Sequence, residues 1–271
     1  MTQPPTLSAT VLLLRDAPQL EVLMVQRSDQ IAFASGALVF PGGKAAVGDA
    51  DPAWGDHAAS APDLAIRVAA LREAYEESGL VLARPKGKTA LVGGGMAHRL
   101  DPMRGAVDRG EVHLLDLMAQ HDLELATDLL VPFGHWITPE VMPQQFDTHF
   151  FVAAAPAGQE ARQDGRETTQ AIWITPQDAL QAEAEGRANI IFPTRMNLRK
   201  LALAHSVADA VQRFAAMPVR TVRPQVEMDS QRGKFLRIPE VEGYGQTIEP
   251  LQNVQKHMRP TPDAQDKAGP G

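Results

Sequence analysis

The sequence contains no cysteine among its 271 residues, and this absence excludes several kinds of chemistry at once. Disulfide bonds, thiolate nucleophiles and cysteine-ligated zinc or iron–sulfur sites are all ruled out. Basic residues are also scarce, because 26 lysines and arginines stand against 33 acidic residues and the formal charge is -7. A chain of this sign repels nucleic acid and anionic lipid, although a local basic pocket can still bind a small anion. We therefore expect neither a nucleic acid nor a membrane as a partner.

Long apolar runs are missing as well. The longest apolar stretches have the length of strands, and no basic segment followed by an apolar run opens the chain, so we predict neither a membrane span nor a signal peptide. The hydrophobic fraction of 44% is that of an ordinary globular protein, and 271 residues are enough to bury a core. These properties predict a cytoplasmic protein and suit both an enzyme and a binding protein. A homodimer is compatible with them.

Apolar runs separated by turn residues predict a mixed α/β fold. Strands are expected at 7–15 and 20–27, joined by a turn at 16–19, and then at 37–40, 134–137, 145–155 and 169–174. Helical spacing predicts short helices within about 96–130, one helix starting at Thr175, and one long helix over 194–216. Two further strands, 219–226 and 234–238, predict a C-terminal hairpin.

These elements divide the chain into a main domain and two appendages. The main domain covers residues 1–216 and includes the helical insertion at about 96–130. A β extension over 217–251 is expected to pack on it. Residues 252–271 are polar and contain proline and glycine, so we predict that this tail is disordered.

The stretch between Ser60 and Gly79 predicts a helix that carries clustered acidic residues. Ser60, with Asp63 three residues later, resembles a capping box, and Gly79 is placed to end the helix. Successive helical residues advance by about 100°, so the apolar positions form a stripe that faces the core: Leu64, Val68, Leu71 and Tyr75. Three carboxylates gather on the opposite face: Glu73, Glu76 and Glu77.

Like charges at this spacing repel unless something neutralises them. A divalent cation would do so, and oxygen-only ligands favour Mg²⁺ or Mn²⁺. Such ions bridge phosphate oxygens and lower the pKa of bound water, which is the chemistry that cleavage of a diphosphate needs. The alternative is a solvated helix face with no ligand. Arg72 fits both interpretations, because it can pair with Glu76 at i+4 or orient a ligand.

The segment Arg72-Glu73-Ala74-Tyr75-Glu76-Glu77-Ser78-Gly79-Leu80 resembles the second half of the Nudix box, Gly-x5-Glu-x7-Arg-Glu-apolar-x-Glu-Glu-x-Gly-apolar. Gly43 stands at the first glycine of the box, and Asp49 replaces its glutamate. Residues 50–71 then separate Asp49 from Arg72, which makes 22 residues where the box has seven.

A similar insertion occurs in enzymes that resemble the peroxisomal coenzyme A diphosphatases. Their upstream signature, Leu-Leu-Thr-x-Arg-Ser-x3-Arg-x3-Gly-x3-Phe-Pro-Gly-Gly, is similar to residues 23–43, with Val25 in place of the threonine and Ala32 in place of the second arginine. Segments around 132–139, 145–151, 173–176, Pro239 and 243–244 are also similar to this long-form branch. The resemblance covers about residues 7 to 245.

The resemblance implies a Nudix fold, which is an α/β/α sandwich with a mixed sheet, here with the helical insertion and the C-terminal hairpin added. It implies that the three clustered glutamates ligate Mg²⁺ or Mn²⁺, that one of them acts as the base, and that water attacks phosphorus. Glu167, six residues before Trp173, is a candidate for a further ligand. The alternative for Glu167 is a solvent-exposed loop charge.

Substrate contacts are expected upstream of the helix. Gly42 and Gly43 would bring backbone close to the metal site or form a tight turn. Arg27 would line an anion pocket, or it would be a surface charge at the end of a strand.

The activity that the resemblance implies is hydrolysis of a diphosphate linkage in a nucleoside diphosphate derivative. Coenzyme A or an acyl-coenzyme A is the preferred substrate, and a sugar or dinucleotide diphosphate is the alternative. A nucleotide-sensing module that has kept the fold but lost turnover is a further hypothesis. Such a module would be expected to have lost one of the clustered glutamates, and this chain has kept all three.

Overall fold

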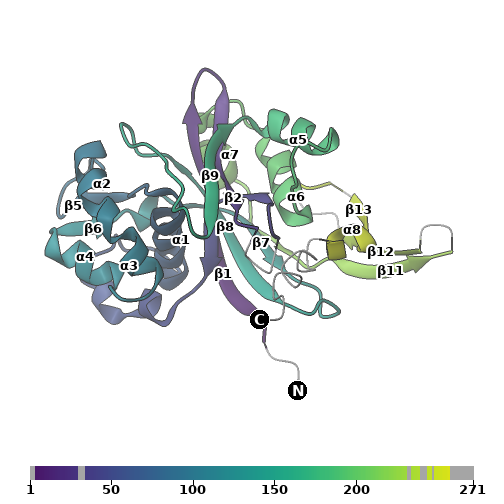
Figure 1. Ribbon diagram of the computed structural model, residues 1–271, viewed down its shortest axis with the longest axis horizontal. Coiled ribbons are helices and arrows are strands. Elements are labelled where there is room, and N and C mark those ends of the chain that lie inside the picture. Colours follow the sequence, from purple (N-terminus) through teal and green to yellow (C-terminus); the bar gives the residue numbers. More distant parts are fainter. Residues whose placement is uncertain (1–3, 30–33, 231–232, 239–242, 246, 257–271) are drawn as a thin grey trace, which may run out of the picture.

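The computed structural model describes residues 4–29, 34–230, 233–238, 243–245 and 247–256. Within these ranges, eight strands form one mixed sheet between two layers of helices (Figure 1), so the predicted α/β/α sandwich is confirmed. Its strands are β1 (Thr6–Asp16), β2 (Leu20–Arg27), β3 (Leu38–Val39), β4 (Gly42–Lys44), β7 (Val131–Ile137), β8 (Phe146–Ala154), β9 (Thr168–Ile174) and β10 (Thr221–Val222). The order is β10-β7-β8-β1-β2-β3, with β4 also paired to β1 and β9 to β2. The β1–β8 and β7–β10 pairs are parallel.

One face of the sheet is covered by the helix that carries the glutamates and by the helical insertion (Figure 1). Within the described residues, this layer contains α1 (Leu64–Ser78), α2 (Gly94–Leu100), α3 (Arg104–Asp108) and α4 (Leu114–Gln120). Short 3-10 turns accompany them: η1 (Val47–Ala50), η2 (Pro52–Asp56), η3 (Asp101–Met103) and η4 (Thr127–Leu129). A two-stranded ribbon that we did not predict pairs β5 (Ala83–Pro85), which precedes the insertion, with β6 (Leu123–Leu125) inside it.

The other face carries α5 (Pro176–Ala184), α6 (Phe192–Leu201) and α7 (Val207–Ala215). Our prediction of a single long helix over 194–216 is wrong, because the helix is interrupted between α6 and α7. Ser206 adopts an extended backbone and its hydroxyl accepts a hydrogen bond from Asp209 N (3.1 Å). His205 N donates to the Asp209 carboxylate (2.9 Å). These local bonds begin a new helix in place of continuing the old one.

The C-terminal extension forms a separate small sheet of β11 (Gln225–Asp229), β12 (Gly233–Ile238) and β13 (Thr247–Pro250) in the described part of the chain, followed by α8 (Leu251–Lys256). Its first strand begins later than predicted, because Pro224 separates it from β10, which joins the main sheet. Arg195 on α6 connects the extension to the domain through ion pairs with Glu183 (2.6 Å) and Glu249 (2.5 Å).

Our prediction of a disordered tail from residue 252 is wrong for the first residues of that tail. Residues 252–256 belong to α8, which Leu251 anchors by packing into the core with 8% of its surface exposed. A single buried leucine at the start of a polar segment gives little periodic signal, so the helix could not be seen in the sequence. The rest of the tail, residues 257–271, lies outside the described residues, as does Pro239.

Side chains of β1 alternate between the two halves of the core. Val11 and Leu13 face α1, whereas Leu12 and Leu14 face the layer of α6 and α7. No helix in the described ranges is both long and apolar enough to cross a bilayer.

The ends of α1 agree only in part with the prediction. Gly79 ends the helix in the left-handed conformation (φ 73°), and its N–H donates to Tyr75 O, as expected. At the other end, Asp63 is the residue before the helix and no side chain caps it, so the capping box at Ser60 is wrong. Ser60 is exposed and lies outside the first turn.

Candidate active site

The acidic face of α1 is buried, although it lies opposite the apolar stripe. Glu76 is 6% exposed and Glu77 is 4% exposed, so the interpretation of this face as a solvated surface is wrong. The short strand β4 covers it. Gly42 N donates to Glu77 Oε2 (3.0 Å), and the carboxylate of Glu73 lies directly against Gly43. The helix therefore places its carboxylates between its own backbone and that of β4.

Both glycines of β4 are required by close approach. A Cβ atom on Gly43 would lie 2.5 Å from Glu73 Oε1, and one on Gly42 would lie 2.5 Å from Ala9 O. Real Cβ atoms do not come this close to other heavy atoms. Gly43 therefore lets β4 approach Glu73 of α1, whereas Gly42 lets β4 approach its partner strand β1. Their contact with substrate stays a prediction.

Arg72 holds the cluster together from one side. Its Nη1 contacts Glu73 Oε1 and Glu76 Oε2, each at 2.9 Å, so the predicted pairing at i+4 is present. Its Nε and Nη2 form two parallel bonds with Asp49, at 2.9 and 3.0 Å. Nη2 also donates to Lys44 O (2.8 Å). Arg72 thus joins α1, β4 and η1.

The structure resolves the role of Asp49, which the insertion had left open. Asp49 is 3% exposed, and its Oδ2 accepts a hydrogen bond from Ala46 N (2.7 Å) while both oxygens bond to Arg72. Asp49 and Arg72 are thus bonded although 22 residues separate them, and the inserted segment packs into the core through Trp54 and Ala58. Burial lowers the pKa of Arg72, but the hydrogen bond to Asp49 and the charges of Glu73 and Glu76 outweigh this effect and raise it, so Arg72 stays protonated.

Burial dominates the ionisation of the three glutamates. It raises the pKa of Glu76 to about 8, against the opposing charge of Arg72. It also raises the pKa of Glu73, and it raises the pKa of Glu77 well above its usual range, with the charge of Glu73 adding to the effect. The Gly42 amide donates to the Glu77 carboxylate, and the charge of Arg27 favours the ionised form without outweighing the effect of burial. A buried carboxylate is a suitable ligand for a divalent ion.

The three carboxylates do not yet converge on one point. In the described part of the chain, the side chains whose ligand atoms all lie within 4.8 Å of one another are His135, Asp147 and His149, and the glutamates of α1 do not form such a group. Glu73 and Glu76 both bond to one nitrogen of Arg72, Nη1, whereas Glu77 is bonded to Gly42 N of β4. Binding of one cation by all three would require at least one of these carboxylates to turn away from the guanidinium.

Glu167 is brought to the same site by a tight loop before β9. The Asp164 carboxylate accepts hydrogen bonds from the backbone of Glu167 and Thr168, and Thr168 Oγ1 donates to Glu77 O (3.3 Å). The charge of Glu167 contributes to the raised pKa of both Glu73 and Glu77. Its side chain is 44% exposed and contacts Arg166 (3.4 Å). Glu167 therefore faces the glutamates of α1 from the solvent side, and its role as a ligand stays a prediction.

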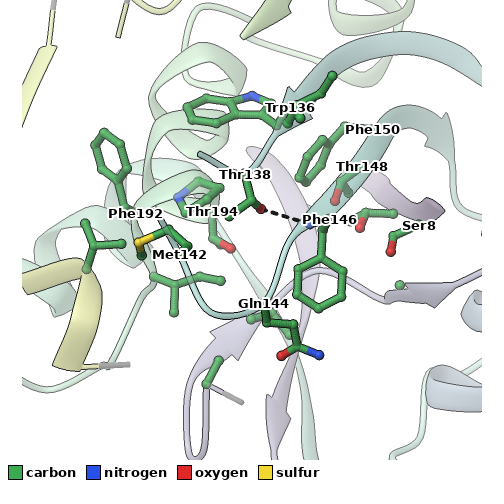
Figure 2. A pocket seen from close by; sticks show the side chains of 18 of the residues that line it. Ser8, Trp136, Thr138, Met142, Gln144, Phe146, Thr148, Phe150, Phe192 and Thr194 are labelled. Carbon is green, nitrogen blue, oxygen red and sulfur yellow. Dashed lines mark hydrogen bonds between the residues drawn. The ribbon is translucent and has the colours of Figure 1, made fainter. Parts of the chain in front are cut away.

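A cavity of about 420 Å³ opens beside β4. The three residues predicted to contact substrate, Arg27, Gly42 and Gly43, all line it. The remaining wall is largely apolar, and Figure 2 shows Trp136, Phe146, Phe150, Met142 and Phe192 around the space. The sequence did not reveal this cavity, because aromatic side chains on strands have the same spacing whether they fill a core or line a pocket.

The buried carboxylates predict a pH-dependent stability of the metal-free protein. A carboxyl whose folded-state pKa lies above its ordinary value of 4.5 stabilises the fold while protonated, and this contribution is lost as the pH rises through the folded value, about 8 for Glu76. We expect the melting temperature of the EDTA-treated protein to fall between pH 5 and pH 8. Mg²⁺ should raise it again, by more at pH 8 than at pH 5, because the ion binds the deprotonated groups.

Thermal melts at several pH values, with and without Mg²⁺, measure this effect. Glu76→Gln should flatten the decline in the metal-free series, since the amide does not ionise. A metal-free melting temperature that is constant or rises between pH 5 and pH 8 would contradict the prediction.

Comparisons with known proteins identify relatives of this chain. The NUDT19 Nudix domain family matches residues 55–201. Acyl-coenzyme A diphosphatase NUDT19 from Xenopus laevis is 24% identical over 205 residues, which are 59% of this chain and 54% of that protein. The human protein of the same name is 25% identical over 232 residues, 69% of this chain and 62% of its own length. The chain thus spans somewhat more than half of these two relatives.

A solved crystal structure has a similar fold. The crystal structure of a NUDIX hydrolase from Alicyclobacillus acidocaldarius superimposes with a TM-score of 0.68 at 26% sequence identity. The match covers 80% of this chain and 100% of that one.

Proposed function

Because this chain belongs to the Nudix hydrolase family and is a Nudix pyrophosphohydrolase, we propose that it cleaves the diphosphate linkage of coenzyme A or of an acyl-coenzyme A. The observation that carries this choice is the position of the cavity. Arg27, Gly42 and Gly43 line it, the two glycines contact Glu77 and Glu73 of α1, and most of the remaining lining is apolar. Coenzyme A has the matching shape, with a charged diphosphate in the middle and a long arm on one side.

Nudix hydrolases generally use divalent metal ions, and the donor set of α1 suits Mg²⁺ or Mn²⁺. We place the ion at Glu73, Glu76 and Glu77, with Glu167 as a further ligand from the solvent side. A cation held there would offset the negative charge that develops at phosphorus and lower the pKa of the attacking water. Arg72 orients Glu73 and Glu76, while Asp49 fixes the guanidinium.

The residues around the ion have separate tasks in this proposal. The amides of β4 lie beside the glutamates, where they can donate to phosphate oxygens once Glu77 has turned to the metal. Arg27 neutralises part of the diphosphate charge from the cavity side. One of the buried glutamates takes the proton from water, and a raised pKa suits it to this task near neutral pH.

The apolar lining of the cavity favours an acyl or pantetheine arm over a second sugar. Its volume of about 420 Å³ lies within the range of about 300–1,000 Å³ that is usual for small-molecule sites. The side chains of Trp136, Phe150 and Phe192 offer few hydrogen bonds to sugar hydroxyls, which would lose their water on entry. The curated relatives are named as acyl-coenzyme A diphosphatases, in line with this choice.

A substrate panel tests the proposal. The protein and Mg²⁺ are incubated separately with coenzyme A, several acyl-coenzymes A, a nucleotide sugar and a dinucleotide polyphosphate. The products are identified by mass spectrometry. We expect adenosine 3′,5′-bisphosphate and 4′-phosphopantetheine, or its acyl form, at the highest kcat/KM. Faster cleavage of the nucleotide sugar or the dinucleotide polyphosphate would contradict the assignment of coenzyme A as the substrate. Tight binding of one compound without turnover would favour a sensing module.

Filling the cavity should discriminate between acyl substrates. Thr148 lines the cavity (Figure 2), and Thr148→Phe would place a ring in the space that we assign to the arm. We expect KM for a long-chain acyl-coenzyme A to rise about tenfold relative to free coenzyme A, which corresponds to about 1.4 kcal/mol of lost binding. Thr148→Val keeps the shape of the side chain and serves as the control. Equal changes in KM for both substrates would place the acyl chain elsewhere.

A further inference from the structure

A second cluster of metal-ligating side chains lies on the main sheet. His135 of β7 and His149 of β8 are register partners, and their rings stack with centroids 4.3 Å apart. Asp147, two residues before His149, projects from the same face of β8. Its Oδ1 lies 2.5 Å from His135 Nε2 and 3.7 Å from His149 Nε2. One ligand atom from each of the three residues thus falls within 4.8 Å of the others.

This cluster is distinct from both the carboxylates of α1 and the cavity. His149 shares its face of β8 with Phe151 and Ala153, which pack against the α1 layer, whereas Thr148 and Phe150 line the cavity on the other face. Apart from Asp147, the acidic group whose charge acts on His149 is Asp63, just before α1. Glu73 is ten residues further along, which is about 15 Å of helix.

The side chains are accessible but held in place. Their exposed fractions are 19% for His135 and 32% for both Asp147 and His149, so an ion can reach them from solvent. Thr221 of the neighbouring strand β10 lies 2.8 Å from His135 Nδ1 through its hydroxyl. The 2.5 Å contact between Nε2 and Asp147 Oδ1 is a hydrogen bond in which Nε2–H donates to the carboxylate. An ion that binds Nε2 takes the place of this proton, and Nδ1–H then donates to the Thr221 hydroxyl. Metal-binding histidines are usually oriented in this way by a bond from the second ring nitrogen.

We propose that His135, Asp147 and His149 form a second divalent-metal site that takes a transition metal such as Zn²⁺, Co²⁺ or Ni²⁺. Imidazole ligands favour these ions over Mg²⁺, whereas the oxygen-only set of α1 has the opposite preference. The chain then holds two metal sites of different selectivity. The remaining coordination positions face solvent and are open to water or to a further ligand.

Small side-chain rotations suffice to form the site. A tetrahedral ion with bonds of about 2.0–2.1 Å requires ligand atoms roughly 3.4 Å apart. The contact between His135 and Asp147 has to open by about 1 Å, and that between His149 and Asp147 has to close slightly. Because the ligands come from paired strands, the ion would fasten β7 to β8, and Thr221 would extend this link to β10. Bound metal should therefore stabilise this edge of the sheet.

Titration with Co²⁺ in saturating Mg²⁺ tests the proposal, because Mg²⁺ competes for the α1 carboxylates but poorly for imidazole. We expect one equivalent to bind with visible ligand-field absorption. His149→Ala and Asp147→Asn should each weaken binding at least tenfold, and Zn²⁺ should raise the melting temperature of the native protein but not of these variants. Circular dichroism verifies folding, and His149→Gln, which keeps more of the side-chain volume, repeats the test.

Two control variants distinguish binding at this cluster from binding at a surface histidine or at the α1 carboxylates. His98→Ala removes an exposed histidine of α2 and should leave Co²⁺ binding unchanged. The double variant Glu73→Gln/Glu77→Gln should also bind Co²⁺ normally, because it alters only the α1 site. Absence of the absorption in the native protein would overturn the proposal. So would undiminished binding in the His149 and Asp147 variants, or loss of binding in the α1 double variant.

Discussion

Glu77→Gln is expected to lower kcat by roughly 10³-fold, which corresponds to about 4 kcal/mol of transition-state stabilisation. The substitution keeps an oxygen that can accept the Gly42 amide bond, and it removes a negative charge that the fold buries with 4% exposure. Folding should therefore be retained while the affinity for Mg²⁺ falls. The size of the effect follows from the proposed role of Glu77, since one carboxylate both ligates the ion and maintains the charge of the site.

Turnover across an Mg²⁺ titration and thermal melting on the same samples measure this effect. Glu160→Gln removes an exposed carboxylate, whose side chain is 78% accessible, and serves as the control. Glu76→Gln should resemble Glu77→Gln in direction. If both variants turn over substrate at the native rate, these residues have no part in the mechanism.

Gly43→Ala is expected to reduce activity by at least about 100-fold, although the change adds one methyl group. The new Cβ would lie 2.5 Å from Glu73 Oε1, so the Glu73 carboxylate has to move away from Arg72 and from the proposed ion. Gly55→Ala is the matched control, because a Cβ there meets no atom within 4 Å. Steady-state kinetics and Mg²⁺ affinity of both variants measure the difference.

A double-mutant cycle identifies the cause of the Gly43 effect. If the clash is with the Glu73 side chain, Gly43→Ala should reduce stability less in a Glu73→Ala background than in the native protein. An equal loss in both backgrounds would mean that β4 itself cannot accept the methyl group. Native activity of Gly43→Ala would show that close approach of β4 to Glu73 is not required.

Local patterns predicted those parts of the molecule that depend on neighbours in the chain. The C-terminal end of α1 at Gly79, the start of α5 at Thr175 and the pair of Arg72 with Glu76 all follow from contacts within five residues. The break between α6 and α7 was missed, because apolar spacing continues across it while Ser206 and Asp209 form a new cap. Periodicity alone does not weigh such side-chain bonds against helix continuation.

Features that depend on distant parts of the chain were harder to predict from the sequence. Burial of Glu76 and Glu77 arises from β4, which covers a face that the helical wheel assigned only as opposite the core. The pair of His135 with His149 depends on the register of β7 and β8, which the spacing of histidines along the chain does not encode. The partner of Asp49 also became clear only in three dimensions, since a long insertion separates it from Arg72.

The bidentate bond between Asp49 and Arg72 means that the length of the intervening segment matters little for stability. Loop-closure entropy grows only with the logarithm of loop length, so extending seven residues to 22 costs about 1 kcal/mol. A buried, charge-assisted pair of hydrogen bonds can offset that amount. Residue 55, where a Cβ meets no atom within 4 Å, is accordingly a suitable position for a small label carried on a side chain, whereas its neighbour Trp54 is buried in the core and has to stay in place.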